Sequence, residues 1–387
     1  MRLPFDITHP LLAAAAWSTI AEPGNSIAGA LVQNLGASEA LAWLISAANN
    51  QCLSPVLGSG TAARHLSRAV ASWVPRLEDL DPRRTVETLS RVGGHVLIPS
   101  DPRWPQRLHD LGTASPFSLW VRGSADLDVQ TSRSVAMVGA RAATAYGEHI
   151  TMDITQDLCT RGFAVISGGA FGVDAAAHRA VLTQGGYTLA AMAGGVDRLY
   201  PAANHQMLRS VMESGGSVIS EVPCGALPMK QRFLARNRVI ACLASATVVV
   251  EAALRSGALS TANHATHLNR PVGAVPGPVT SMQSAGCHEL IRSGAAMCVT
   301  EGAEVADLAG GMGVDAAPGK AGADATTDGL SQNELSVLDS FPARGSTTVT
   351  ALARNGGVSV PGVLSALGVL ETRGLVSACG SQWRRGK

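Results

Sequence analysis

The chain has 387 residues, of which 46% are hydrophobic and 15% are charged, and its formal net charge is +1. This length predicts two or three domains, and the apolar content excludes a disordered chain. The near-zero charge excludes a bulk polycation, so any contact with nucleic acid has to come from a local basic patch. The seven scattered cysteines lack C-x-x-C spacing, and no uncharged apolar stretch reaches the ~20 residues of a membrane span. We therefore expect a cytoplasmic protein without disulfides, a zinc ribbon or membrane contact.

Residues 1–95 are predicted to form a small helical domain. Apolar residues recur at helical spacing in Leu11–Ile20, Ile27–Leu35 and Glu39–Ala48, and glycine-containing turns separate these segments. Short helices joined in this way are compatible with a helix-hairpin-helix or SAM-like module. A connector rich in Pro and Trp follows up to Gly123, and its dense prolines exclude a long helix. We expect the connector to be irregular chain with one short strand that covers an edge of the next domain.

Residues 96–305 are predicted to form an extended Rossmann-like core. From Ser134 onwards, short apolar strands alternate with helical stretches, which is typical of an α/β fold with a parallel sheet covered by helices on both faces. Six or seven strands are expected, from among Val135–Val138, Ala164–Ile166, Thr188–Met192, Val218–Ile219, Thr247–Val250, Val272–Val275 and Ala296–Val299. The helices between them are expected to begin near Tyr146, Val173, Asn204, Lys230, Ser260 and Cys287.

Residues 306–328 are predicted to be a flexible linker, because Gly310–Asp328 is rich in Gly, Ala and Asp and has no aromatic residue. The remaining residues, 329–387, begin with the capping-box pattern Ser-Gln-Asn-Glu at Ser331. Two further helical patterns and a short strand pair follow it. Three helices and a hairpin in a segment of this size predict a winged-helix-like domain.

The carboxyl ends of the predicted strands carry the clearest chemical signal. Parallel sheets bind ligands at these ends, and neighbouring helix N-termini add partial positive charge, so loops of Gly and Ser there predict an anion site for phosphate. The dinucleotide fingerprint and the Walker lysine are both absent, which leaves a mononucleotide or a nucleic-acid backbone as the ligand. The alternative is that the glycines only permit tight turns. The four loops are Gly139–Arg141, Ser167–Gly172, Ala193–Gly195 and Val275–Gly277.

The segment Lys230–Arg238 reads K-Q-R-F-L-A-R-N-R and contains four cations, no carboxylate and one aromatic ring. Single-stranded nucleic acid needs this combination, since cations contact phosphates and a ring stacks on a base. Lys230 and Arg232 therefore join the candidate contact residues. The alternative is a solvated helix face on which Phe233 is an anchor in the core.

Candidates for acid–base chemistry are few. Asp174 and His178 are spaced i, i+4 on one predicted helix, where they could share a proton or a metal ion, or form a structural pair. Glu221 and Glu251 each follow a strand, where a carboxylate could act as a general base. The G-x-S-x-G and H-E-x-x-H motifs are absent. We expect no catalytic residue, no metal site and no cofactor.

Taken together, the motifs resemble one family, the DNA-processing protein A (DprA/Smf) proteins. Each motif alone has little specificity, whereas the ordered set over residues 138–295 is highly specific. The helical N-terminal domain and the winged-helix-like tail are similar to those of longer family members. The matching segments are Val138–Arg141 with Tyr146-Gly147, Ser167–Asp174 with Ala177-His178, Gly194–Asp197 with Tyr200-Pro201, Ser220-Glu221, Phe233 with Arg236–Arg238, Glu251 with Ser256-Gly257, Pro276-Gly277, and Gly286 with Leu290-Ile291 and Gly294-Ala295.

The resemblance implies a homodimer that binds single-stranded DNA and loads the recombinase RecA in natural transformation, and that is not an enzyme. It also implies which residues contact the DNA: Arg141, Ser167, Gly168, Gly169, Phe233, Arg236, Asn237 and Arg238. Two positions depart from the family pattern. Leu234 stands where the family usually has a proline, and Ala202 stands where it often has a basic residue. Both are expected to change the DNA groove and its affinity.

Two other classes of function stay open as alternatives. One is a nucleotide-binding or nucleotide-hydrolysing Rossmann protein similar to the phosphoribohydrolases. Their signature is Pro-Gly-Gly-x-Gly-Thr-x-x-Glu, and the nearest element here, Glu251 with Ser256-Gly257, has the wrong order. The other is an NAD-dependent dehydrogenase, which the missing dinucleotide fingerprint disfavours.

Overall fold

The computed structural model divides the chain into two compact units, Met1–Ala317 and Pro318–Lys387, and we describe each by itself. Within the described part of the chain, no helix is both long and apolar enough to cross a bilayer. The residues that the structure describes are 3–50, 61–124, 126–311, 313–317 and 327–386.

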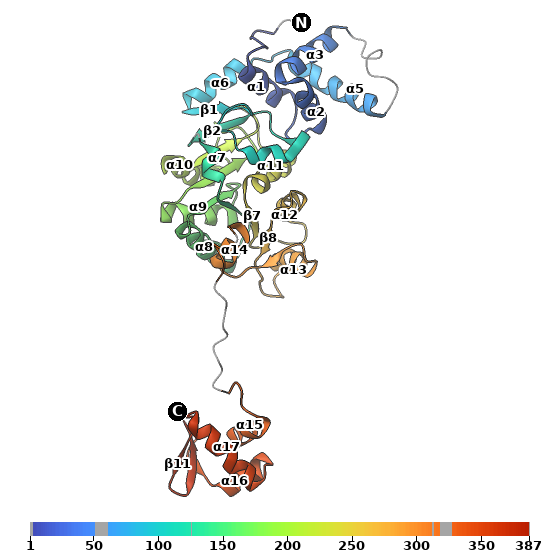
Figure 1. The fold of residues 1–387 in the computed structure, drawn as a ribbon. Coiled ribbons are helices and arrows are strands. Elements are labelled where there is room, and N and C mark those ends of the chain that lie inside the picture. The colour runs from blue at the N-terminus through green and yellow to red at the C-terminus, as the bar shows by residue number, and fades with distance from the viewer. Residues whose placement is uncertain (1–2, 51–60, 125, 312, 318–326, 387) are drawn as a thin grey trace. The chain divides into compact units, whose positions relative to one another are not determined.

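Helices dominate the first part of the chain, as the apolar spacing predicts (Figure 1). The buried ring of Trp17 meets that of Trp73 edge to face at 5.5 Å, at the centre of an apolar cluster. The hydroxyls of Ser18 and Ser118 are 2.7 Å apart and are buried, which ties these helices to the connector. The helices are α1 (Pro10–Ile20), α2 (Ser26–Leu35), α3 (Ala37–Asn50), α5 (Thr61–Trp73) and α6 (Pro82–Arg91), with a 3₁₀ helix at Val74–Leu77.

The connector contributes two strands, where the sequence predicts one. Strand β1 (Gly94–Leu97) pairs antiparallel with β2 (Leu119–Gly123), and β2 pairs antiparallel with the edge of the parallel sheet. A 3₁₀ helix at Gln106–Ala114 separates them. The boundary predicted between residues 95 and 96 falls inside β1. The sequence does not reveal this strand because it is short and its pairing partner lies more than twenty residues later in the chain.

The sheet confirms the predicted α/β class. Within the described residues it has nine strands in the order β1-β2-β6-β5-β4-β3-β7-β8-β9, and the seven strands from β3 to β9 are parallel. Each of the seven expected strands is present. Their bounds are β3 (Ser134–Val138), β4 (Ala164–Ser167), β5 (Thr188–Met192), β6 (Ser217–Ser220), β7 (Ala246–Val249), β8 (Val272–Ala274) and β9 (Met297–Cys298).

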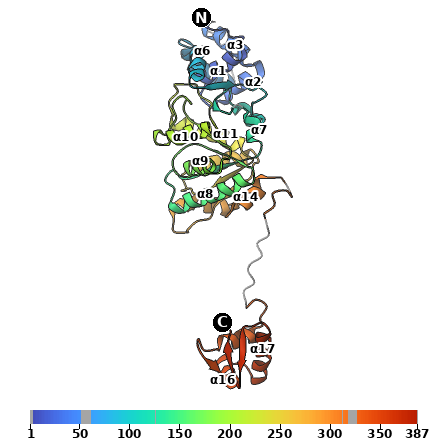
Figure 2. The same ribbon diagram turned by 90° about the vertical axis from the view of Figure 1, so that its left-hand side faces the viewer.

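Helices cover both faces of the sheet (Figures 1 and 2). Alternate residues of β3 point to opposite faces: Val135 and Met137 pack with α8, α9 and α14, while Ala136 and Val138 pack with α11, α12 and α13. This double burial explains why the strands read as continuous apolar runs. The helices are α7 (Leu127–Thr131), α8 (Ala145–Thr160), α9 (Val173–Gln184), α10 (His205–Glu213), α11 (Lys230–Leu243), α12 (Gly257–His267), α13 (Ala285–Arg292) and α14 (Gly302–Ala309).

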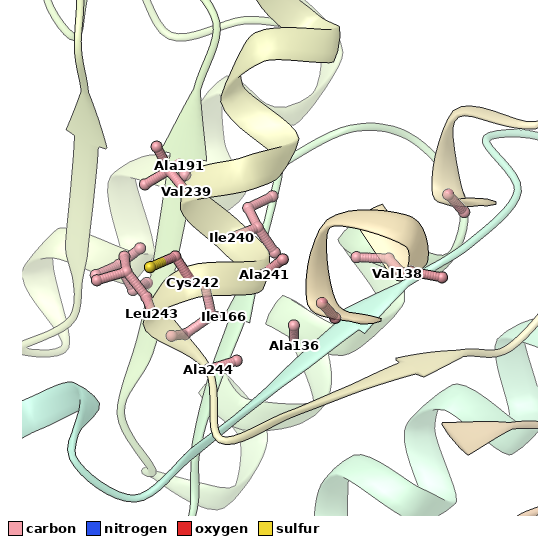
Figure 3. Close-up of a cluster of buried hydrophobic side chains, with 14 of the residues drawn as sticks. Ala136, Val138, Ile166, Ala191, Val239, Ile240, Ala241, Cys242, Leu243 and Ala244 are labelled. Carbon is pink, nitrogen blue, oxygen red and sulfur yellow. The ribbon is translucent and has the colours of Figure 1, made fainter. Parts of the chain in front are cut away.

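Helix α11 is firmly anchored by its second half. Val239–Leu243 are buried against the sheet face that carries Ala136, Ile166 and Ala191 (Figure 3). The helix begins at Lys230, where the sequence predicts a start. Its first two turns are therefore held at a fixed place by a buried second half, which matters because the basic run lies on them.

The order in which strands are added to the sheet reverses at β3 and β7. Strands β4, β5 and β6 are added successively on one side of β3, and β7 is then added on its other side. The loops that follow β3 and β7 consequently leave the sheet side by side and run to opposite faces. Such a switch point forms a crevice at the carboxyl ends of the strands.

The predicted linker, 306–328, begins too early. Residues up to Ala309 belong to α14, and Asp315 forms an ion pair with Arg133, with N–O distances of 2.7 and 2.8 Å. The hydrogen bonds from Arg133 lower the pKa of Asp315 to about 2. Residues up to Ala317 thus belong to the first unit. Composition alone did not reveal this attachment because it depends on one carboxylate whose partner is far away in the sequence.

Within residues 327–386, the second unit has three helices and a three-stranded sheet of order β10-β12-β11. The predicted capping box at Ser331 and Glu334 is present. The winged-helix assignment of this unit stays a prediction. The elements are α15 (Gln332–Asp339), α16 (Val349–Gly356), α17 (Val360–Thr372), β10 (Ser346–Thr347), β11 (Val376–Cys379) and β12 (Gln382–Arg385).

Candidate nucleic-acid interface

A cleft of about 760 Å³ opens at the switch point of the sheet. Its walls are the loop after β3, the start of α9, the first half of α11, and the segment that leads from β7 into α12. Four cations and one carboxylate line it: Arg141, Lys230, Arg236, Arg255 and Asp174. The excess of positive charge suits a polyanion. The structure therefore brings together five of the ten predicted contact residues, namely Arg141, Lys230, Phe233, Arg236 and Asn237.

The ring of Phe233 lies between a cation and a second ring. The guanidinium carbon of Arg141 is 4.8 Å from the centroid of the Phe233 ring, and the ring of Tyr200 is 5.9 Å away at an interplanar angle of 53°. Phe233 is only half-buried, and it belongs to none of the buried apolar clusters formed by the described residues. The alternative that Phe233 anchors the core is therefore wrong. Its partners place an aromatic face and a guanidinium side by side at the cleft.

The loop after β4 is closed by its own hydrogen bonds. The backbone N–H groups of Gly168 and Ala170 donate to Asp174 at 3.1 and 3.3 Å, and the Ser167 hydroxyl donates to the carbonyl of Met137 at 2.6 Å. The Gly168 amide is consequently engaged by the protein itself. In the predicted phosphate site, the amides of Gly168 and Ala170 are therefore not free to bind an anion, and Ser167 and Gly169 are buried beside the cleft without lining it.

Gly168 has a second purpose, which is to leave space for Arg236. A Cβ atom at this position would lie 1.9 Å from a terminal nitrogen of Arg236, so only glycine permits the guanidinium to sit there. Arg236 is 7% exposed and donates to the carbonyl of Ala191 at 2.5 Å, while its Nε has no partner among the described residues. Burial lowers the pKa of Arg236 to about 10, and nearby Asp174 opposes that shift. A buried cation with unused donors at a cleft is a strong anion ligand.

Arg255 is a cleft residue that sequence reasoning missed. It is exposed and immediately precedes Ser256, whose hydroxyl caps α12 by accepting from the Ala258 amide at 3.2 Å. On the same side, Asn237 donates to the carbonyl of Gly257 at 3.2 Å and ties α11 to α12. Arg255 stands alone in the sequence rather than in a basic run. The available signal was its position just after a strand, at the start of a helix.

Arg232 and Arg238 do not line the cleft and are paired with carboxylates. Arg238 forms a buried ion pair with Glu221, in which the two side chains are 5% and 8% exposed. Arg232 makes two hydrogen bonds to Glu22, at 2.8 and 3.1 Å. The basic run therefore separates into residues that face the cleft and residues that bind other parts of the protein.

The candidates for acid–base chemistry have structural partners. Glu251 is 1% exposed and accepts from the amide and the hydroxyl of Thr144 at 2.8 and 2.6 Å, so it shapes the loop after β3. His178 is fully buried, with its Nδ1 2.8 Å from the Thr188 hydroxyl. Among the described residues, no group of three or more His, Cys, Asp or Glu side chains is arranged to hold a metal ion. Glu251 and His178 are therefore occupied by folding contacts, whereas Asp174 lines the cleft and accepts from the amides of Gly168 and Ala170.

His178 should make the stability of the protein fall in weak acid. Burial, aided by Arg236, lowers the pKa of His178 from 6.5 to about 4. Since the folded pKa lies below the ordinary value, this contribution to stability is complete above pH 6.5 and is lost as the pH falls, amounting to about 2 kcal/mol by pH 5. Replacing His178 with glutamine should shrink this acid-dependent loss in denaturant titrations. The matched control is the same change at His205, an exposed residue. Equal pH slopes for the wild type and the His178 variant would contradict the expectation.

Comparison with known proteins agrees with the fold. A family model described as DNA recombination-mediator protein A matches residues 95–310, which include the cleft and the nine-stranded sheet except for Gly94, the first residue of β1. The putative DNA processing protein DprA of Mycobacterium tuberculosis is 40% identical over 385 residues, covering 96% of this chain and 94% of that protein. The DNA processing protein DprA of Streptococcus pneumoniae is 38% identical over 205 residues, covering 53% of this chain and 71% of that protein.

A solved structure supports the same conclusion. The X-ray structure of DNA processing protein A from Streptococcus pneumoniae matches with a TM-score of 0.57 at 30% sequence identity, covering 76% of this chain and 94% of that chain. The relative from Mycobacterium tuberculosis aligns over nearly the full length, so the resemblance is not limited to the Rossmann-like core. The ordered motifs, the sheet and the three comparisons agree, and the chain belongs to the DNA recombination-mediator protein A family.

Proposed function

We propose that this protein binds single-stranded DNA in the cleft at the switch point and, as a homodimer in the cytoplasm, loads RecA onto the bound strand for recombination, including natural transformation. The observation that carries the proposal is the arrangement of Phe233 against Arg141 within a cleft lined by four cations and one carboxylate. Cations and an accessible ring are the two elements that single strands require. The proposal assigns the protein no turnover of the DNA.

Within the cleft, each residue has an expected role. Arg141 and Arg236 are expected to bind neighbouring phosphates, because guanidinium groups form paired hydrogen bonds to phosphate oxygens. Lys230 and Arg255 extend the positive charge on the two sides. Phe233 is expected to stack on a base. The Ser167–Gly169 loop and Asn237 support the site, since their described hydrogen bonds fix the shape of its walls.

The ring of Phe233 argues for single strands over duplex DNA. In a duplex each base face is already stacked on its neighbours, so a half-buried ring in a cleft can pair only with a base that has left the stack. Phosphate contacts alone would accept both forms. In this proposal the half-buried ring supplies the preference for single strands, and the cations supply most of the affinity.

Binding should be strong for oligo-dT, weaker for a matching duplex, and dependent on salt for both. The slope of log affinity against log salt is expected near −0.7 for each phosphate neutralised in a single strand. Fluorescence anisotropy with labelled oligonucleotides at several salt concentrations measures the affinities and the slope. Equal affinity for the two forms, or affinity independent of salt, would contradict the proposal.

Replacing Arg141 with alanine should weaken binding to every single-stranded sequence by about tenfold, because one charge-assisted contact to a phosphate is lost. The salt slope should flatten by about 0.7, the share of one phosphate. The matched control is Arg179→Ala, which removes an exposed arginine of α9 that does not line the cleft. Wild-type affinity and slope in the Arg141 variant would remove the centre of the proposed site.

A further inference from the structure

The loop between α1 and α2, residues 21–25, contacts the DNA-facing helix α11 at two points. The carboxylate of Glu22 accepts hydrogen bonds from Nε and Nη2 of Arg232 at 2.8 and 3.1 Å. Gly24 lies against Arg238, so closely that a Cβ atom on Gly24 would be 2.9 Å from the arginine Nε. The N-terminal helices thus reach the same helix that supplies Lys230 and Phe233 to the cleft, although about two hundred residues separate them in the sequence.

Glu22 joins three parts of the fold. Besides Arg232, it accepts from Arg76 at 3.2 Å, and Arg76 also donates to the carbonyl of Ile20 at the end of α1. The pKa of Glu22 is lowered, chiefly by the hydrogen bonds from Arg232, so this carboxylate is charged at neutral pH. The Glu22 side chain is 37% exposed and that of Arg232 is 17% exposed, so this ion pair lies near the protein surface, where the N-terminal helices meet α11, rather than in the core.

Arg232 is held by several bonds at once. Its Nη1 donates to the carbonyl of Leu227 at 3.0 Å, while Nε and Nη2 are committed to Glu22. A two-bond pair between guanidinium and carboxylate fixes direction as well as distance. Arg232 is therefore oriented toward the N-terminal helices and not toward the cleft. What it fixes is the first turn of α11, which has no side-chain cap of its own.

We propose that Glu22 is a positioning residue for single-stranded DNA binding. Through Arg232 it holds the first turn of α11 in place, so that Lys230 and Phe233 are oriented to contact the bound DNA. This inference rests on the proposed function of the cleft. In this proposal the N-terminal helical segment sets the geometry of the wall of the DNA site that α11 forms.

The sign of the effect separates positioning from simple electrostatics. Replacing Glu22 with glutamine removes a negative charge near a polyanion site, and on charge alone the affinity for DNA should rise. Positioning predicts the opposite. The first turn of α11 gains freedom, stacking and phosphate contact lose their preorganised geometry, and affinity should fall about threefold to tenfold.

The test measures oligo-dT affinity, salt slope and melting temperature for Glu22→Gln and for Glu78→Gln on the same day and in the same buffer. Glu78 is an exposed carboxylate two residues after Arg76, and the change in net charge is identical. We expect Glu22→Gln to weaken binding and Glu78→Gln to leave it unchanged or slightly stronger. Glu22→Asp, which keeps the carboxylate, should recover part of the loss. Unchanged or tighter binding by Glu22→Gln, or an equal loss in the control, would overturn the inference.

A second pair of variants tests whether Arg232 acts only through Glu22. Arg232→Met should weaken binding about as much as Glu22→Gln, without flattening the salt slope, and the double variant should be no weaker than the worse single variant. A slope flattened by about 0.7 would show that Arg232 contacts a phosphate directly and would overturn the inference. If the wild type binds oligo-dT and these variants bind it with the same affinity, the positioning role is refuted but the proposed function is not. Absence of binding by the wild type would refute the proposed function itself.

Discussion

Replacing Phe233 with alanine is expected to weaken binding to single-stranded DNA by about 1–3 kcal/mol, which corresponds to a loss of about fivefold to 150-fold. The ring is half-buried, lies against the Arg141 guanidinium at 4.8 Å and belongs to no buried cluster of the described residues. Its truncation therefore removes a stacking surface and opens no cavity in the core. The salt slope should stay nearly unchanged, because no charge is lost.

The control for this prediction is Phe171→Ala. Phe171 is also an aromatic residue near the carboxyl end of a strand, but it is 47% exposed and does not line the cleft. Anisotropy titrations and melting curves on the same samples separate stacking from unfolding. We expect Phe233→Ala to melt within a few degrees of the wild type and to bind weakly. A folded Phe233 variant with wild-type affinity would contradict the stacking role.

Replacing Arg238 with methionine should destabilise the protein by about 3–5 kcal/mol, because Glu221 would remain buried without its partner. The pair is almost fully inaccessible, with side chains 5% and 8% exposed. Burial raises the pKa of Glu221, and Arg238 opposes that rise. Without Arg238 the folded pKa of Glu221 lies further above its unfolded value. The variant should then regain stability relative to the wild type as the pH falls below that raised pKa and Glu221 takes up a proton.

The double variant Arg238→Met with Glu221→Leu should recover most of the lost stability, since apolar side chains of similar volume can replace a buried pair at little cost. As a control, Arg209→Met breaks an exposed pair with Glu213 and should change the free energy of unfolding by less than about 1 kcal/mol. Denaturant titrations measure these differences. If the double variant is stable and still binds oligo-dT, Arg238 supports the fold. A stable double variant that no longer binds would instead make Arg238 a DNA contact.

The positions of strands and helices in the core could be predicted because strands that are buried on both faces of a sheet appear in the sequence as continuous apolar runs. Helix α11 begins at the expected residue, Lys230, and its polar first half is followed by the buried run Val239–Leu243. The presence of two strands, β1 and β2, in the connector could not be predicted from the sequence. Their pairing partners are distant in the sequence, and both strands are short and separated by a segment rich in prolines.

The candidate site was predictable in its place but not in every role. The loop chemistry and the basic run indicate the edge of the sheet at which the cleft lies, and five of the ten predicted contact residues line that cleft. The sequence shows charges but not their partners, so Arg232 and Arg238 looked equivalent to Arg236. Glu22, which binds Arg232, lies 210 residues away, and Glu221 lies 17 residues from Arg238. The same limit hid Arg255, a single cation that the fold alone brings to the cleft.

The claim that single strands bind in this cleft is tested most directly by locating the contact itself. Oligo-dT carrying one 5-iodouracil can be bound to the wild-type chain, irradiated, digested and sequenced by mass spectrometry. Stacked aromatic residues cross-link efficiently to this base, so the account predicts a cross-link at Phe233 or at its neighbour Tyr200, with loss of the product in Phe233→Ala. A dominant cross-link within residues 327–386, or one unaffected by the loss of Phe233, would place the DNA elsewhere and contradict the account.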